Sequence, residues 1–163
     1  MSKRSAFVQI RVTPKEKATL MGLAESAGQD LSRYILSRSL PSNRLRFEEI
    51  VRMLREGVDH PFVLAELNDT LAGLAPVEFP DAVGTADLSG LSPFLSNYVA
   101  AMVEHASGLK HVNPPSWTSS VEPLARPHFA TPLRSLRLHL MRASPVPFKR
   151  RNIFVDSSVG ARV

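Results

Sequence analysis

Cysteine is absent from the 163 residues of this chain. Its absence excludes disulfides, zinc-thiolate sites and thiol nucleophiles, and it fits a reducing cytoplasm. Long apolar runs are also missing, since none approaches the roughly 20 residues that cross a bilayer. We therefore expect a soluble, cytoplasmic protein that has no contact with a membrane.

The sequence also lacks the usual signatures of catalysis. Its five histidines do not have metal-ligand spacing, such as two histidines one helical turn apart. It contains neither a glycine-rich phosphate loop nor a nucleophile elbow. We expect no enzymatic activity, no metal site and no cofactor.

The charged residues are unevenly distributed along the chain. Residues 1–55 hold 11 Lys or Arg against 5 Asp or Glu, residues 56–122 hold 1 against 9, and residues 123–163 hold 8 against 1. Two basic ends therefore flank an acidic middle. This asymmetry predicts that one end binds a polyanion and the other either a polyanion or an acidic protein. Alternatively, the basic C-terminal end packs on the acidic middle of the same or a second chain.

An alternating segment lies near the start of the sequence. Val8, Ile10 and Val12 would share one face of a β-strand, because side chains alternate between the two faces of a strand. A single strand leaves its backbone groups unpaired and its apolar face exposed, so we expect two chains to pair their strands. The outer face of that ribbon would present Phe7, Gln9 and Arg11. Glutamine reads adenine and arginine reads guanine in the DNA major groove.

Two helices are expected after this strand. The sequence Thr13-Pro14-Lys15-Glu16 is a strong helix start, with its threonine as N-cap, its proline in the first position and its glutamate completing a capping box. Gly28 ends this helix. Asp30 then caps a second helix that runs to the breaker Pro41, since proline cannot continue a helix.

This order of elements resembles the ribbon-helix-helix (Arc/MetJ-like) DNA-binding family. The resemblance covers residues 4–40 and is carried by FVQIRVTPKEKATLMGLAESAGQDLSRYILSRSL. It implies an intertwined homodimer on double-stranded DNA, with the outward strand residues on the bases and a phosphate at the start of the second helix. The expected DNA-binding residues are Lys3, Arg4, Phe7, Gln9, Arg11, Asp30, Leu31 and Ser32.

Further helices are predicted in the remainder of the chain. Apolar stripes at helical spacing mark residues 44–57, 62–74 and 93–108, and a shorter helix is expected at 132–142. The interval 76–92 is rich in Gly, Pro, Asp and Ser, which is typical of a linker.

The expected fold class is therefore mainly α. An N-terminal ribbon-helix-helix domain (1–42), with one strand per chain, precedes a helical connector (43–75) and the linker. A helical and extended partner-binding region (93–163) with a basic tail closes the chain.

The C-terminal region combines arginines with aromatic residues. No acidic residue lies between Glu122 and Asp156, and the tail FKRRNIFV is similar to the C-terminal ends of some bacterial antitoxin-like regulators. Arginine and aromatic side chains are typical of interface hot spots, and they also stack on nucleobases. The expected partner-binding residues are Trp117, Arg126, Phe129, Arg134, Arg137, Phe148, Lys149, Arg150, Arg151 and Phe154.

Together the two ends indicate an antitoxin. The dimeric head would bind operator DNA and repress its own operon, and the tail would neutralise a cognate toxin protein. Three alternatives stay open. The C-terminal region could bind a small effector in a transcription regulator, the chain could assist a relaxase as a plasmid-mobilisation accessory protein, or residues 93–163 could form a self-contained helical subdomain with solvated arginines.

Overall fold

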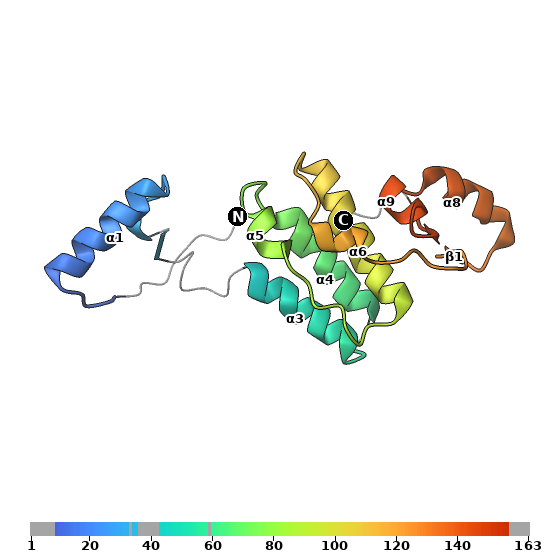
Figure 1. The fold of residues 1–163 in the computed structure, drawn as a ribbon, viewed down its shortest axis with the longest axis horizontal. Helices are drawn as coiled ribbons and strands as arrows, with labels where there is room; N and C mark the ends of the chain where they lie inside the picture. Colours follow the sequence, from blue (N-terminus) through green and yellow to red (C-terminus); the bar gives the residue numbers. More distant parts are fainter. Residues whose placement is uncertain (1–8, 33, 36–42, 59, 157–163) are drawn as a thin grey trace. The chain divides into compact units, whose positions relative to one another are not determined.

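The chain divides into two compact units, Met1–Leu40 and Pro41–Val163. The computed structural model describes residues 9–32, 34–35, 43–58 and 60–156 of them (Figure 1). Ala24 is the one buried apolar residue among the described residues of the first unit, whereas the second unit has an extensive core.

The first unit contains helix α1 (Pro14–Ser26). Its predicted capping box is confirmed: the Thr13 hydroxyl accepts the Glu16 N–H at 3.3 Å, and the Glu16 carboxylate accepts the Thr13 N–H at 2.8 Å. After Gly28, which has a φ of +63°, residues 31, 32, 34 and 35 again have helical backbone.

The predicted ribbon-helix-helix fold is contradicted. Residues 9–13 form no strand, and the first regular element among the described residues begins at Pro14. Ile10 and Val12 are 53% and 43% exposed, while Phe7 and Val8 lie outside the described residues. An alternating sequence predicts which side chains would share one face of a strand. A strand also needs a partner for its backbone N–H and C=O groups. A single chain supplies no such partner in the described part of this unit.

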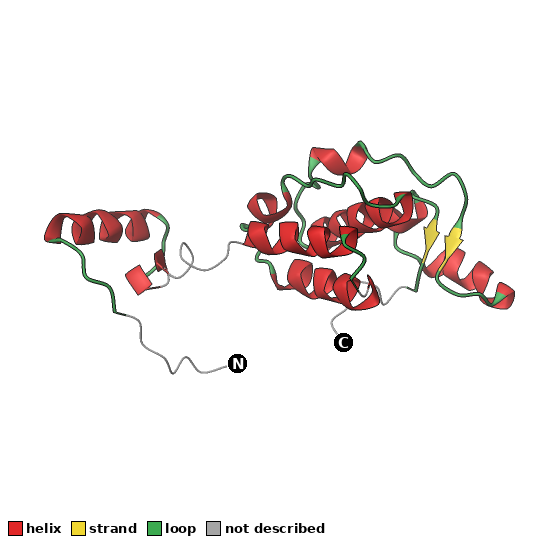
Figure 2. Ribbon diagram, turned by 90° about the horizontal axis from the view of Figure 1, so that it is seen from below, coloured by secondary structure: helices red, strands yellow, loops and turns green. Residues whose placement is uncertain are grey.

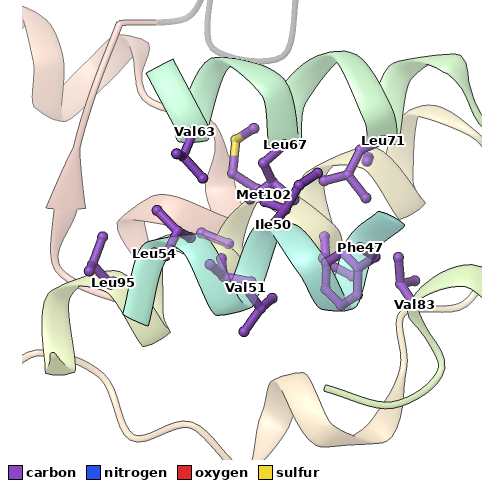
Figure 3. Close-up of a cluster of buried hydrophobic side chains, with 14 of the residues drawn as sticks. Phe47, Ile50, Val51, Leu54, Val63, Leu67, Leu71, Val83, Leu95 and Met102 are labelled. Atoms are coloured by element: carbon purple, nitrogen blue, oxygen red, sulfur yellow. The ribbon is translucent and has the colours of Figure 1, made fainter. Parts of the chain in front are cut away.

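The second unit is built on four helices: α3 (Asn43–Arg55), α4 (His60–Gly73), α5 (Phe79–Val83) and α6 (Pro93–Leu109). Their apolar stripes face one another, and Figure 3 shows Ile50 of α3, Leu67 of α4 and Met102 of α6 gathered in one cluster. The start of α6 follows the sequence signal, since the Ser92 hydroxyl accepts the Leu95 N–H at 3.2 Å. Burial of these stripes is the main source of stability for helices of this length.

The interval expected as a linker is part of this core. It contains α5, in which Phe79, Ala82 and Val83 are buried. The loop after α5 is held by Arg55, whose guanidinium donates to the backbone oxygens of Ser89 at 2.7 Å and Asp87 at 2.8 Å. The loop-like composition of residues 76–92 therefore did not predict α5, a short helix that packs on one side of the core.

The rest of the unit consists of short helices and two short strands (Figure 2). They are α7 (Ser116–Ser119), β1 (His128–Phe129), η1 (Arg134–Leu136), α8 (Arg137–Ala143), α9 (Val146–Lys149) and β2 (Ile153–Phe154). Strands β1 and β2 form a parallel pair, with His128 opposite Ile153 and Phe129 opposite Phe154. The described chain is therefore mainly helical with one very small sheet, and none of its described helices is long and apolar enough to cross a membrane.

Replacing Thr13 by alanine tests the cap of α1. We expect a loss of about 1 kcal/mol of helix stability, measured as a lower amide exchange protection at Glu16. Hydrogen bonds from the Thr13 N–H and hydroxyl hold the pKa of Glu16 below its usual 4.5. The half of the cap that the Glu16 carboxylate provides is therefore complete above pH 4.5 and should be lost as the pH falls through the lowered value. Thr19→Ala, in the middle of the exposed helix face, should cost no protection; equal losses in the two variants would contradict the cap.

Candidate functional site

Arg151 anchors the C-terminal region within the second unit. The residue is 5% exposed, and its side chain reaches four acceptors. One terminal nitrogen donates to the Glu104 carboxylate and the Thr118 backbone oxygen, both at 2.6 Å. The other donates to the Asn97 side-chain oxygen and the Val121 backbone oxygen, both at 3.2 Å. Because a guanidinium is a planar fork of donors, one residue joins the tail to α6, α7 and the loop that follows α7.

Two residues expected to bind a partner are therefore parts of the core. Arg151 is one, and Phe148, which has no exposed surface, is the other. The Phe148 ring meets Tyr98 of α6 edge-on, with the centroids 5.3 Å apart. Burial of this kind raises the pKa of the Tyr98 hydroxyl. The pattern FKRRNIFV thus fixes the end of the chain to α6 and does not present these two side chains to a partner.

Three further expected residues contact one another beside the small sheet. Phe129 and Phe154 stack with their centroids 4.9 Å apart, and the Arg137 guanidinium lies 4.9 Å from the Phe129 centroid. Asn152 has a φ of +56°, a left-handed conformation that asparagine tolerates better than most residues. Its side chain donates to the Leu124 backbone oxygen at 2.6 Å. This arrangement holds β2 against β1.

Residues 131–143, which we call the arm, contain η1 and α8. Figure 1 shows α8 beside β1 at one end of the second unit. The exposed fractions of its apolar side chains are large: 58% for Leu133, 44% for Leu136, 69% for Leu138 and 48% for Met141. Leu140, at 6%, is the buried residue of α8. The arm therefore touches the body of the unit along one side and leaves an apolar surface to solvent.

Arginines are interleaved with this apolar surface. Arg134, Arg137 and Arg142 are all exposed. An open groove of about 630 Å³ runs along α8, and its walls include Leu138, His139 and Arg142. The arm thus combines the two kinds of side chain, apolar and arginine, that are enriched at the centre of protein interfaces.

The other expected partner-binding residues are scattered. Arg126 and Arg150 are exposed, while the Lys149 ammonium donates to the Arg142 backbone oxygen at 2.8 Å. Trp117 is half-buried and donates its ring N–H to the Val83 backbone oxygen at 2.8 Å. These contacts hold the unit together, and only Arg134 and Arg137 of the expected set belong to the arm.

The expected DNA-binding residues belong to the first unit. Gln9, Arg11, Asp30 and Ser32 are exposed, and Leu31 is half-buried. Lys3, Arg4 and Phe7 lie outside the described residues.

Sequence reasoning missed the exposed leucines of the arm. Only arginine and aromatic residues were assigned to partner binding, and Leu133, Leu136 and Leu138 were treated as ordinary helix-forming residues. A signal was available, because Leu138 and Leu140 are two positions apart, which on a helix places them about 200° from each other. Only one of the two can face the body of the unit, so the other must face solvent or a partner.

Four of the nine acidic residues of the chain's acidic middle form ion pairs with arginines from outside that interval. Arg52 pairs with Glu56 at 2.7 Å and Arg55 with Asp87 at 3.1 Å. Further pairs join Arg46 to Glu66, and Arg151 to Glu104 at 2.6 Å. The expected packing of the basic tail on the acidic middle is thus seen at Arg151, while α3 supplies the other three arginines.

Comparison with models of protein families gave no match, and comparisons with curated proteins and with solved structures gave none either. Within the described residues, no cluster of three or more His, Asp or Glu could hold a metal ion.

Arg150 and Arg151 offer a direct test, because they are neighbours with opposite environments. Arg151→Ala should cost about 3–5 kcal/mol of unfolding free energy, since it leaves Glu104 as a buried charge without its partner. Arg150→Ala, at an exposed position, should change stability by less than about 0.5 kcal/mol. Urea unfolding followed by circular dichroism measures both; similar losses in the two variants would overturn the assignment of Arg151 as the anchor.

Proposed function

We propose that this chain is an antitoxin-type regulator that acts in the cytoplasm. Its first unit binds operator DNA as a homodimer and represses its own operon, and its second unit binds and neutralises a toxin protein. The proposal includes no catalytic step and no cofactor. The observation that carries it is the arm, a folded surface rich in exposed leucine and arginine on a unit whose core is complete without it.

The homodimer is supported by the incomplete burial of the first unit. Helix α1 has 13 residues and buries only Ala24. Met21 and Leu23 on this helix are 45% and 47% exposed. Ile10 and Val12, which precede the helix, are 53% and 43% exposed. An isolated helix of this length is marginal in water, and a unit of about 40 residues usually needs oligomerisation, a metal or disulfides. With no cysteine in the chain, a second copy is the simplest cover for these side chains.

DNA binding is supported by the charge of the same unit. Residues 1–40 hold 7 Lys or Arg against 3 Asp or Glu. Gln9 and Arg11 are exposed next to the start of α1, where Lys15 and Lys17 are exposed as well. Arginine and glutamine hydrogen-bond to base edges, while lysines neutralise phosphates. The unit therefore offers both the nonspecific and the specific contacts that an operator requires.

A protein partner fits the second unit better than a small effector does. The hollow between α4 and α6, lined by Leu71, Met102 and Lys110, has a volume of about 180 Å³. Ligand pockets usually measure about 300–1,000 Å³ and enclose most of the ligand. The larger groove along the arm is open, as a protein interface is.

Arg11→Ala should weaken binding to the duplex upstream of the gene by about 1–3 kcal/mol, which is the value of a bidentate base contact. Fluorescence anisotropy over a salt series measures the affinity for this duplex and for a scrambled one. Lys17→Ala is the control: it should weaken binding to both duplexes alike and reduce the salt slope by about 1. If wild type and Arg11→Ala bind both duplexes equally, specific DNA recognition by this unit is refuted.

Ile10→Asp should convert the full-length chain to a monomer, because it places an unpaired charge in the apolar surface that two copies bury. Sedimentation velocity at micromolar concentration reports the mass. Leu138→Asp adds the same charge to an exposed apolar position of the second unit and should leave the dimer intact. A monomeric wild type, or a dimer that persists in Ile10→Asp, would contradict dimerisation through the first unit.

A further inference from the structure

The arm exposes apolar side chains whose burial is not needed to fold the second unit. Leu138, at 69%, and Met141, at 48%, lie on α8 together with Leu140, which is 6% exposed. Because residues two apart lie on opposite sides of a helix, Leu140 attaches α8 to the unit and Leu138 points away from it. A contiguous exposed apolar surface on a folded protein usually marks a binding site.

Both ends of the arm are fixed. Before it, the Ala130 N–H donates to the Phe154 backbone oxygen at 2.9 Å. After it, the Ser144 hydroxyl oxygen lies 2.6 Å from the Leu140 backbone oxygen and 2.7 Å from the Val155 backbone oxygen, so that its one hydrogen is shared between these two acceptors, and it accepts the Val155 N–H at 2.9 Å. A surface that is held in one conformation loses little entropy on binding. The arm is therefore preorganised for docking.

The charge of the arm limits the chemistry of its partner. Arg134, Arg137 and Arg142 are exposed among the leucines, and no acidic residue lies between Glu122 and Asp156. A complementary surface is apolar at its centre and acidic at its rim. A second copy of this chain is the weaker match, because the chain carries a net charge of +5 and six of its acidic residues already pair with its own arginines: Glu48, Glu49, Glu56, Glu66, Asp87 and Glu104.

We propose that the exposed side of the arm is a docking surface for a partner protein that has an apolar groove rimmed by carboxylates. This inference rests on the proposed function and names the chemistry of the toxin surface. A lipid surface would favour a helix with separate apolar and charged faces, whereas here Arg137 and Arg142 flank the exposed pair Leu138 and Met141 within a helix of seven residues. A nucleic acid would favour free aromatic rings, whereas Phe129 and Phe154 stack on each other.

The test uses the full-length chain with Leu138→Ser and Met141→Ser combined. The control combines Phe62→Ser and Val77→Ser, which remove apolar side chains that are 65% and 83% exposed elsewhere on the same unit. Each protein is immobilised and incubated with lysate of the source cells, and the retained proteins are identified and quantified. The protein that depends on the arm is then purified, and its binding is measured by calorimetry and by hydrogen exchange. Anionic phosphatidylglycerol vesicles and a random duplex serve as parallel probes.

The expected result is one protein that wild type and the control bind alike and that the arm variant binds at least about tenfold more weakly, as for a pair of hot-spot residues. It should protect residues 133–142 from exchange and bind more weakly as salt is added. Should the apolar variant fail to fold, Arg134→Glu with Arg142→Glu provides the same comparison through charge. The inference is overturned if no retained protein depends on the arm, if vesicles or DNA show that dependence, or if the arm variant alone dissociates the homodimer.

The failure of this inference can be told apart from the failure of the proposed function. A toxin that the arm variant still retains would leave the antitoxin function standing and overturn the docking surface. A partner that requires the arm but does not arrest growth when expressed alone would leave the surface standing and overturn the antitoxin function. Anisotropy on operator DNA should be the same for wild type and the arm variant, since the changes lie in the second unit.

Discussion

The buried guanidinium of Arg151 is the interaction on which the C-terminal half of this protein depends. Transferring a charge from water into a protein costs several kcal/mol unless hydrogen bonds and a counter-charge replace the water. Glu104 supplies the charge, and Asn97, Thr118 and Val121 supply further acceptors. Lysine could not replace it, because an ammonium cannot reach acceptors spread around a planar fork. The Nε atom of Arg151 is buried without a hydrogen-bond partner in the described structure, which further ties the stability of this site to the other two nitrogens.

The position of the arm follows from this anchor. Arg151 fixes the chain immediately before β2, and β2 in turn pairs with β1 at the entry to the arm. The exit is fixed by Ser144, which bonds to the residue that follows β2. A short segment with little core of its own is thus held rigid by contacts made on either side of it. The local stability of a segment depends on the density of buried contacts around it. Here those contacts are made by Ser144, Arg151 and β2.

The helices were more predictable than the site. Stripes at helical spacing predicted α3, α4 and α6 within a few residues, because Phe47, Ile50 and Leu54 repeat with the helical period and one face is enough to drive burial. The strand predicted near residue 10 was wrong, since strand pairing depends on a partner that local alternation does not specify. Arg151 was assigned to a partner-binding surface because arginines and aromatic residues are interleaved in the acid-free C-terminal region. Nothing in the order of residues shows that Glu104, 47 positions earlier, is brought beside it by the fold.

Exposed apolar side chains have different consequences in the two units, because the units differ in how much apolar surface they bury. Among its described apolar residues the first unit buries only Ala24, and Met21 and Leu23 are exposed; the homodimer proposed above would remove these side chains from water. The second unit has a core that runs from Phe47 to Val155, and removing Leu138 from water is not needed to fold it. Apolar area that folding does not require still lowers solubility. Its retention in a rigid, acid-free segment is therefore better explained by binding than by stability.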